Sequence, residues 1–356
     1  MFEPMRIQSH TGPYQVEFAT DLLERVEELQ LGTPHFLIDA TIARLYAKPL
    51  ERLLSDPRTI LIEANEENKS IDRIIPVIER LVANSIRRDH HLLAIGGGVI
   101  QDIACFIAST LLRGIEWRFV PTTLLAQADS CIGSKSSINL GRVKNILGTF
   151  NPPRHIWICP TFLDTLDEKE IHSGIGEIIK VHAIAGPETF VKLGPDFERM
   201  MRDRPWLLTC IREALRIKQG YIERDEFDRN ERLVFNYGHS FGHAIETASR
   251  FAIPHGVAVT MGMDLANRIA VLRGLAPESA YQRMHGALHW NYRAFLEVPI
   301  QVDPLLSALM KDKKNTATNL MLILPVGDEA RISRMAVTPD ATFREQCEQT
   351  LKEMRG

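Results

Sequence analysis

A histidine-rich stretch near residue 240 contains residue types that bind divalent metal ions. His239 and His243 are four residues apart, so a helix places both imidazoles on one face. His255 opens the next helical pattern, and Glu177 lies in an earlier one, three residues before Lys180. Imidazole and carboxylate ligands suit zinc or a similar ion, and a catalytic site needs only three protein ligands. The spacing alone also allows histidines that are satisfied by backbone groups and solvent.

A run of three glycines, Gly96 to Gly98, follows a buried-strand pattern and precedes a helical one. Glycine lets the backbone approach a pyrophosphate, and the N-terminus of a helix favours negative charge. The spacing is not GxGxxG, so a plain tight turn is the alternative. Asp102, in the first helical turn, could cap the helix or contact a nucleotide.

Basic residues next to small polar residues are candidates for binding an anionic substrate. The run Gly133 to Ser137 combines small residues, hydroxyls and the ammonium of Lys135, and Lys144 and Asn145 follow closely. That chemistry suits phosphate or sugar hydroxyls. Each such residue alone is more often a solvated surface charge than an anion-binding group. The candidates are Arg113, Lys135, Lys144, Lys180, Lys218, Arg232, Lys313 and Lys314.

The first part of the chain alternates short apolar runs with helical patterns. Strands are expected at 35–39, 59–63, 91–95 and 117–120, and helices at 40–54, 71–83 and 99–112. This alternation predicts an α/β domain with a parallel sheet over residues 1–160, and such sheets bind ligands beyond the carboxyl ends of their strands.

The remainder, residues 161–356, is expected to be mostly α-helical. Amphipathic helical patterns cover 168–184, 206–224, 234–250 and 257–272, and the one strong strand candidate is 320–325. The proline-rich stretch 151–160 is the expected boundary between the two domains.

Composition and charge exclude several classes of protein. The 356 residues carry 42 Lys and Arg against 45 Asp and Glu, a net charge of −3 that argues against a nucleic-acid binder. No apolar run approaches the about 18 residues of a membrane span, and the N-terminus lacks a signal-peptide pattern. The five cysteines are scattered without a CxxC pair, which favours reduced thiols in the cytoplasm.

Taken in order and spacing, the motifs resemble the 3-dehydroquinate synthase family of sugar phosphate cyclases, from roughly Tyr14 to Pro325. The motifs that carry the resemblance are Gly96–Asp102, Arg113–Gly114, Pro121–Asp129, Lys144–Gly148, Gly176–Lys180, Asn236–Glu246, His255–Gly256 and Asp312–Lys314.

The resemblance implies a dehydroquinate synthase-like fold: an N-terminal nucleotide-binding domain, a helical metal- and substrate-binding domain, and an active site in the cleft between them. It implies a zinc or cobalt ion on Glu177, His239 and His255, which moves His243 from the metal to the substrate phosphate. Phosphate contacts are implied for Lys135, Asn236, His243 and Lys314 (or Lys313), together with the partner subunit's Arg113 in a homodimer. Carboxylate contacts are implied for Lys218 and Arg232, and ring-hydroxyl contacts for Asp129, Asn145 and Lys180. NAD contacts are implied for Asp39, Glu66, Lys69, Gly97, Gly98, Asp102, Thr122, Thr123 and Lys144.

The implied reaction belongs to the shikimate pathway of aromatic amino acid biosynthesis. In the family, 3-deoxy-arabino-heptulosonate 7-phosphate is oxidised transiently by NAD, loses phosphate, is reduced again, and closes to 3-dehydroquinate by an intramolecular aldol reaction. Other cyclases of the superfamily act on sedoheptulose 7-phosphate, glucose 6-phosphate or an amino analogue, and metal-dependent polyol phosphate dehydrogenases share the architecture. Cys105, Ser134, His182 and Asn230 depart from the usual family pattern and leave the substrate more open than the fold.

Overall fold

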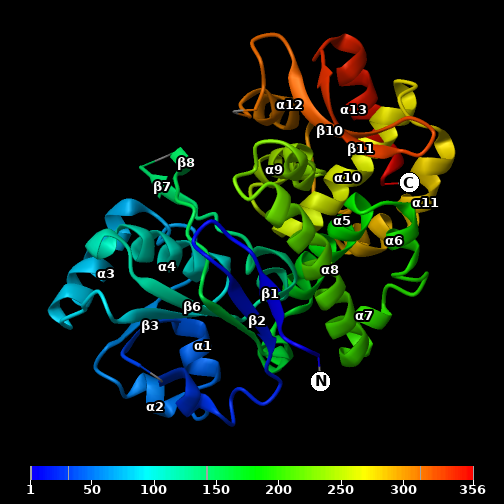
Figure 1. Cartoon of the computed structure of the whole chain (residues 1–356). Helices are drawn as coiled ribbons and strands as arrows, with labels where there is room; N and C mark the ends of the chain where they lie inside the picture. The colour runs from blue at the N-terminus through cyan, green and yellow to red at the C-terminus, as the bar shows by residue number, and fades with distance from the viewer. Residues whose placement is uncertain (1, 31, 142, 313, 356) are drawn as a thin grey trace. The chain divides into compact units, whose positions relative to one another are not determined.

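The computed structural model describes residues 2–30, 32–141, 143–312 and 314–355 (Figure 1). Contacts between Cα atoms divide the chain into two units. The first unit contains Met1–Leu166 and Lys218–Phe227, and the second contains Asp167–Ile217 and Asp228–Gly356. Each unit is described by itself below.

The first unit is built on a seven-stranded sheet in the order β1-β2-β9-β6-β5-β3-β4. Only β1 is antiparallel to its neighbour in this sheet, and the other pairs are parallel. The central strands are continuous apolar runs, as expected for a sheet covered on both faces. The strands are β1 Met5–Ile7, β2 Tyr14–Phe18, β3 Pro34–Asp39, β4 Thr59–Ile62, β5 His91–Gly96, β6 Glu116–Pro121 and β9 His155–Ile158.

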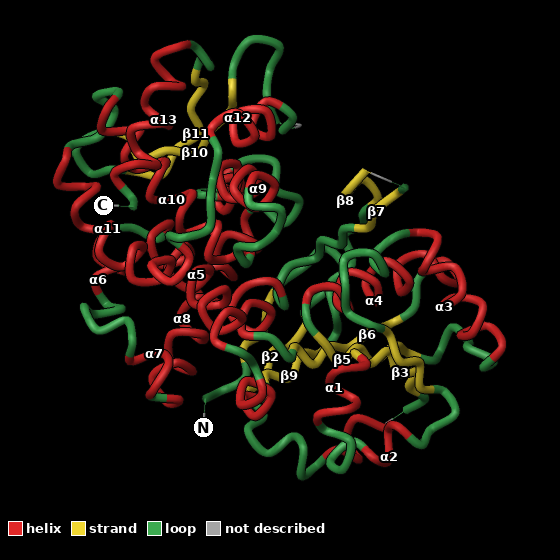
Figure 2. Tube along the Cα trace, turned by 180° about the vertical axis from the view of Figure 1, so that it is seen from behind, coloured by secondary structure: helices red, strands yellow, loops and turns green. Residues whose placement is uncertain are grey.

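Helices cover both faces of this sheet. In Figures 1 and 2, α3 (Ile71–Ala83) and α4 (Gly98–Thr110) lie on one face, and α1 (Ala40–Leu45) and α2 (Glu51–Leu54) lie on the other. The chain therefore leaves β3 and β5 toward opposite sides. The carboxyl ends of two such neighbouring strands form the switch point at which open α/β sheets bind ligands.

The expected single helix over 40–54 is wrong, because α1 ends at Leu45 and α2 begins at Glu51. Pro49 lies between them, lacks an N–H group and disfavours helical backbone at Lys48. The sequence also gave no signal for the hairpin of β7 (Ile138–Leu140) and β8 (Val143–Leu147). Short helical turns complete the unit at η1 Val26–Gln30, η2 Leu111–Arg113, η3 Ala126–Ser130 and η4 Pro160–Thr165.

The second unit is a helical assembly around α10 (His255–Leu272), whose residues are almost all buried. Helix α10 packs against α5, α9, α11, α13 and β10. None of the helices in the described ranges is long and apolar enough for a membrane span. The other helices are α5 Glu168–Ile184, α6 Pro187–Val191, α7 Arg199–Arg202, α8 Arg204–Arg224, η5 Glu231–Asn236, α9 His239–Ala248, α11 Glu278–Tyr292, η6 Arg293–Phe295, α12 Val302–Met310 and α13 Ala341–Glu353.

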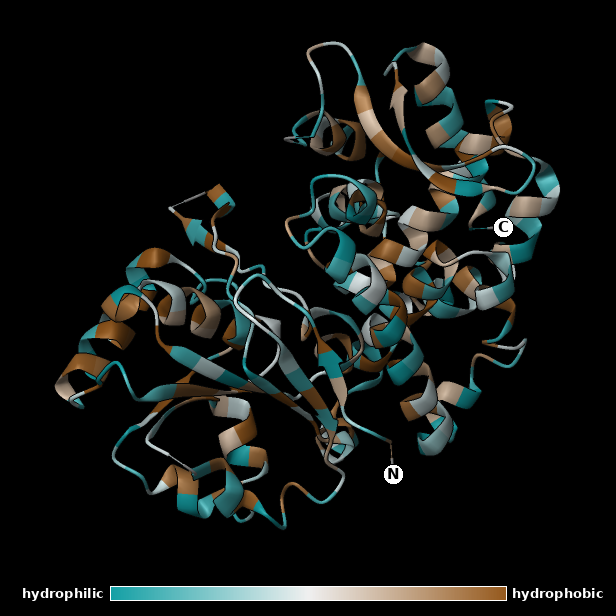
Figure 3. Ribbon diagram, in the orientation of Figure 1, coloured by the Kyte–Doolittle hydropathy of each residue, from teal (hydrophilic) through white to brown (hydrophobic). Residues whose placement is uncertain are grey.

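One expectation for this unit is wrong, and a second is confirmed with an addition. The predicted helix over 234–250 is broken, because η5 ends at Asn236 and α9 begins at His239. The strand candidate over 320–325 is confirmed as β10 (Leu320–Val326), the long apolar strand of Figure 3, but it pairs with the unexpected β11 (Arg331–Val337). Only Val337 of β11 is buried, and the other residues are half-buried or exposed without regular alternation, so the sequence carries no clear strand signal.

Candidate functional site

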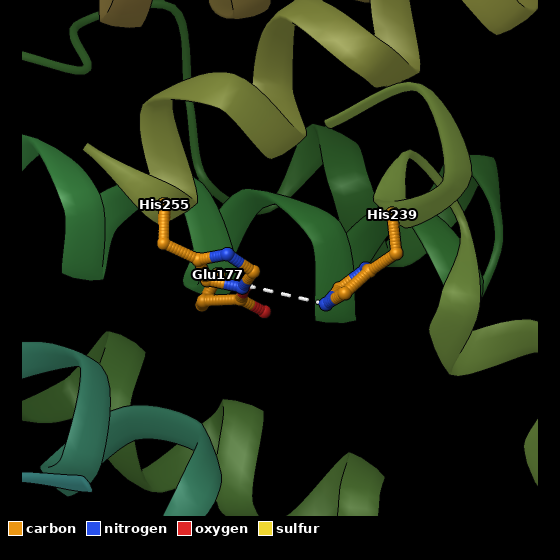
Figure 4. Close-up of side chains that lie close together, drawn as sticks. All are labelled: Glu177, His239 and His255. Carbon is orange, nitrogen blue, oxygen red and sulfur yellow. Dashed lines mark ion pairs between the residues drawn. The ribbon is translucent and has the colours of Figure 1, made fainter. Parts of the chain in front are cut away.

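Three side chains from three helices of the second unit meet at one point (Figure 4). Glu177 lies in α5, His239 is the first residue of α9, and His255 is the first residue of α10. Their possible ligand atoms all lie within 4.8 Å of one another. The Nε2 atoms of His239 and His255 lie 3.8 and 3.5 Å from Glu177 Oε1. The structure thus brings together the three residues expected to bind a metal ion.

Two glycines beside these residues set the distance between α5 and α10. A Cβ atom on Gly256 would lie 1.9 Å from the main-chain oxygen of Ser173, and one on Gly176 would lie 2.2 Å from the Gly256 oxygen. No methyl group fits at such distances, so the two helices can approach this closely only through glycine. Because Gly176 precedes Glu177 and Gly256 follows His255, this approach brings the carboxylate to the imidazole.

A third glycine places His239. Gly238 has a φ of +75°, in the left-handed region, and it is the residue that precedes α9. A Cβ atom there would lie 2.5 Å from the main-chain oxygen of Val259 in α10. Glycine therefore permits both the turn that ends η5 and the close packing of α9 on α10, which directs the His239 ring toward Glu177.

The Nδ1 atoms of His239 and His255 each face a hydrogen-bond acceptor. His239 Nδ1 lies 3.2 Å from the main-chain oxygen of Tyr237, and His255 Nδ1 lies 3.1 Å from Glu246 Oε2. A carbonyl and a carboxylate can only accept, so we assign the proton to Nδ1 in each ring. The Nε2 lone pairs are then available beside Glu177, which is the usual arrangement of histidines that bind metal. Two imidazoles and one carboxylate fit a divalent ion and leave room for a substrate oxygen.

Burial and neighbouring charges lower the pKa of His239 and of His243, which favours the neutral imidazole, the form that can bind a metal ion. Burial, and next the charge of Lys180, holds the pKa of His239 well below its usual range. Although the His243 side chain is exposed on one side, desolvation by the surrounding protein, and next the charge of His255, lowers its pKa to about 4. At His255 burial also lowers the pKa, but the carboxylates of Glu246 and Glu177 outweigh it and the pKa is raised.

The ammonium of Lys180 lies beside this cluster. Its ammonium forms an ion pair with Glu177 Oε2, one helical turn away, and both side chains are only 2% exposed. The ammonium also lies 5.5 Å from the centre of the Phe235 ring. Lys180 therefore stands where it can contact an oxygen that binds next to Glu177.

The predicted phosphate residues of the second unit lie beside the same histidines. The Lys314 ammonium donates to Asn236 Oδ1 at 2.8 Å. The centre of the His243 ring lies 5.5 Å from that of His239 and 5.6 Å from that of His255. Burial lowers the pKa of Lys314, while nearby Asp312 opposes that shift. These side chains form a polar rim next to Glu177, His239 and His255.

Two other predictions concern this unit. Arg232 is buried within η5, four residues before Asn236. Lys313, the alternative to Lys314, lies outside the described residues.

The residues expected to contact NAD lie at the carboxyl edge of the sheet in the first unit. Strand β3 ends at Asp39 and β5 at Gly96, and Ile38 pairs with Ile95, so the two strand ends are adjacent. Gly97 and Gly98 lead into α4. Gly96 also pairs with Pro121 of β6, which places Thr122 and Thr123 at the same edge. Burial raises the pKa of Asp39, whose carboxylate caps α1 by accepting from the Thr41 amide.

A second group of predicted NAD residues forms one hydrogen-bonded network. The Lys69 ammonium lies 3.2 Å from Asp102 Oδ2 and 3.6 Å from Glu66 Oε2. The Asn139 amide donates to Glu66 Oε1 at 2.8 Å, and Asn139 Oδ1 accepts from the Asn145 amide. Burial raises the pKa of Asp102 to about 6, against the pull of Lys69. Asn139 was not predicted, because its partner Glu66 is distant in the chain and no local pattern connects them.

Lys218 and Asp129, which had been assigned to different parts of the substrate, contact each other. The Lys218 ammonium lies 2.6 Å from Asp129 Oδ1 and donates to the Asp129 main-chain oxygen. Both side chains are nearly buried, and both residues belong to the first unit. By contrast, Arg113, Lys135 and Lys144 are exposed on the first unit.

Two of the residues that depart from the family pattern are buried packing residues. Burial raises the pKa of the Cys105 thiol to about 12, and its sulfur lies 3.2 Å from the Asn151 oxygen. His182 Nδ1 lies 2.8 Å from the Ile178 oxygen, one turn earlier in α5. Neither contact involves Glu177, His239 or His255, so both residues lie outside that cluster.

Comparison with known proteins gives the same family over most of the chain. Residues 59–173 match the N-terminal model of 3-dehydroquinate synthase, and residues 174–315 match the C-terminal model. The 3-dehydroquinate synthase of Alkaliphilus oremlandii is 34% identical over 324 residues, which is 89% of each chain.

Two solved structures of cyclases are also similar. A 2-deoxy-scyllo-inosose synthase, solved with carbaglucose-6-phosphate, NAD+ and Co2+, has a TM-score of 0.85 at 26% identity and covers 98% of this chain and 100% of its own. The 2-epi-5-epi-valiolone synthase of Streptomyces hygroscopicus subsp. jinggangensis, solved with NAD+ and Zn2+, has a TM-score of 0.79 at 26% identity over 96% of each chain. By its sequence, its fold and these matches, the chain belongs to the 3-dehydroquinate synthase family of sugar phosphate cyclases.

Proposed function

We propose that the protein is a 3-dehydroquinate synthase, which converts 3-deoxy-arabino-heptulosonate 7-phosphate to 3-dehydroquinate and phosphate. The observation that carries this proposal is the cluster of Glu177, His239 and His255, with the polar rim of Asn236, His243 and Lys314 beside it. A metal-ligand set next to a phosphate-type anion site suits an enzyme that acts on a sugar phosphate.

The cluster is proposed to hold a divalent zinc or cobalt ion, and the carboxyl edge of the first unit to hold NAD. When bound, NAD would remove and return one hydride and the divalent ion would polarise the substrate oxygens, so no cofactor is consumed overall. The similar structures that contain NAD+ with Co2+ or Zn2+ support this assignment.

The chain's own residues would bind and orient the substrate. Lys314 and Asn236 already lie in hydrogen-bond contact, and together with His243 they would hold the phosphate group. Lys180 would contact a ring hydroxyl close to Glu177. Fixing a dianion and a ring in one geometry is itself a large part of catalysis, because it replaces a search in solution by one oriented complex.

The choice of a carboxylate-bearing sugar depends on two buried cations. Lys218 and Arg232 are each 6% exposed, and the Lys218 ammonium pairs with Asp129. The family resemblance assigns both to the substrate carboxylate. Cyclases whose substrates lack a carboxylate need no such pair, so we favour the heptulosonate over sedoheptulose 7-phosphate or glucose 6-phosphate.

The test is an assay of the purified protein with NAD, cobalt or zinc, and 3-deoxy-arabino-heptulosonate 7-phosphate. Phosphate, NADH and product mass are followed together. We expect stoichiometric phosphate, a product with the mass of dehydroquinate, and no net NADH. Lys314→Met should lower phosphate release sharply, whereas Lys311→Met, an exposed lysine at the end of α12, should not.

Two other outcomes would overturn the proposal in different ways. Faster phosphate release from a sugar that lacks the carboxylate would mean that the enzyme is another cyclase of the superfamily. Stoichiometric NADH without phosphate release would mean a polyol phosphate dehydrogenase.

A further inference from the structure

Glu246 lies beside the metal-binding cluster but has no role in the reaction described so far. It occupies α9, three residues after His243 and seven after His239, so it faces the same side of the helix. Its side chain is 15% exposed, and its Oε2 atom lies 3.1 Å from His255 Nδ1. The contact joins α9 to α10, the two helices whose first residues are His239 and His255.

Two overlapping sets of possible metal ligands share His255. One set is Glu177, His239 and His255, and the other is His243, Glu246 and His255. The two sets use opposite sides of the ring, because Nε2 faces Glu177 and Nδ1 faces Glu246. An imidazole that binds an ion through Nε2 normally keeps its proton on Nδ1. An ion in the first set therefore makes Glu246 a hydrogen-bond acceptor rather than a ligand.

Burial favours the first set over the second. Glu177 is 2% exposed and its carboxylate faces both Nε2 atoms. His243, which would be needed for the second set, is exposed at the polar rim. An ion held by the exposed set would also occupy the imidazole assigned to the substrate phosphate.

We propose that Glu246 is a positioning residue, which accepts the Nδ1–H of His255, holds its Nε2 toward Glu177, and makes that ring a stronger metal ligand. The inference rests on the proposed function, since it assumes that the first set binds the ion. His239 receives the same orientation from a main-chain carbonyl, which carries no full charge. The carboxylate partner would thus make His255 the more strongly bound of the two imidazoles.

The experiment measures cobalt binding, so that it does not depend on turnover. Metal-free wild-type protein, Glu246→Ala, Glu246→Gln and His255→Ala are titrated with Co2+, and the visible absorption of the bound ion reports affinity and coordination. Thr247→Ala is the matched control, because Thr247 is the exposed neighbour in α9 and its hydroxyl donates to a main-chain oxygen. Thermal unfolding of each metal-free variant shows whether it is folded.

We expect Glu246→Ala to bind cobalt about 10- to 100-fold more weakly, with an altered spectrum, while Thr247→Ala binds like the wild type. Glu246→Gln should recover much of the loss, because its amide oxygen still accepts from Nδ1. Wild-type affinity in Glu246→Ala, together with lost binding in His255→Ala, would overturn the inference and leave the proposed function intact. A loss in both Glu246 variants as complete as in His255→Ala would make Glu246 a ligand. No cobalt binding by the wild type would overturn the inference and the proposed metal site together.

Discussion

Lys180 forms an ion pair with Glu177, the carboxylate proposed to bind the metal ion. The two side chains form an ion pair in a region where each is 2% exposed, so their attraction is weakly screened by water. A divalent ion beside Glu177 would have to bind close to this ammonium. The lysine thus favours the charged carboxylate but opposes the ion, and a substrate oxygen nearby would benefit from both positive charges.

Lys180→Met should therefore separate metal binding from turnover. We expect cobalt affinity that is unchanged or higher by up to about tenfold, because the competing ammonium is gone. Turnover should fall strongly, since the group proposed to contact the ring hydroxyl is lost. Loss of cobalt binding in this variant would show that Lys180 is needed to hold the carboxylate in place.

The three proposed ligands should behave differently from Lys180. Glu177→Ala, His239→Ala and His255→Ala should each lose bound metal and lower turnover by more than about 100-fold, beyond the range expected for outer partners of a ligand. Metal content is measured in the same samples as turnover. Full activity without bound metal in any one of the three variants would refute that residue's assignment.

At the scale of helices and strands, the sequence predicts an element well where residues close in the chain define its ends. Helix α5 has the predicted bounds, because Asp167 caps it by accepting from the Glu170 amide. The break before α9 was missed, since it depends on the left-handed conformation of Gly238 and its contact with α10.

Contacts between residues that are far apart in the chain leave no pattern in the local sequence. Glu246 was placed only within a family motif, and its bond to His255 requires knowledge of how α9 and α10 pack. The site residues on unit 2 could be named from the motif order, but the partners that orient them could not.

The packing of α5 on α10 can be tested with one methyl group. Gly256→Ala places a Cβ atom against the main chain of Ser173, where neither helix can yield without moving Glu177 or His255. We expect a loss of about 1–3 kcal/mol in the free energy of unfolding and weaker cobalt binding. Urea denaturation and the cobalt titration measure the two effects.

Gly286→Ala is the matched control for this substitution. Gly286 lies exposed in α11, and a Cβ atom there would meet no atom within 4 Å. This variant should gain about 0.4–1 kcal/mol, because alanine restricts the unfolded chain and fits the helix. If both variants bind cobalt like the wild type, the glycine contact does not set the geometry of the cluster.

At the scale of the whole chain, buried ionisable groups make stability depend on pH. His35 and His91 lie on the neighbouring strands β3 and β5 and are 0% and 4% exposed. Burial lowers the pKa of each to about 4, and the charges of His90 and Arg118 respectively add to the shift. Asp102, in the same unit, has its pKa raised by burial to about 6.

The two kinds of shift act in opposite directions as the pH falls. Below about pH 6.5 the unfolded chain protonates both histidines and the native protein does not, so stability present above that pH is lost toward pH 4. Protonation of Asp102 favours the native state from about pH 6 downward. Within this window the unfolded chain binds two protons, at His35 and His91, and the native protein binds one, at Asp102. The free energy of unfolding should therefore fall by about 1.4 kcal/mol for each pH unit.

Replacing one group of each kind tests the balance. The unfolding free energy of the metal-free protein is measured in urea at about pH 7 and about pH 5.5, with hydrogen exchange in β3 and β5 reporting on the first unit. His35→Gln should lose less stability between the two pH values than the wild type, because one proton-binding site of the unfolded chain is gone. Asp102→Asn should lose more, because the opposing site is gone. Equal losses in the wild type and His35→Gln would show that His35 is protonated in the native state, and that its burial does not govern the acid stability of this unit.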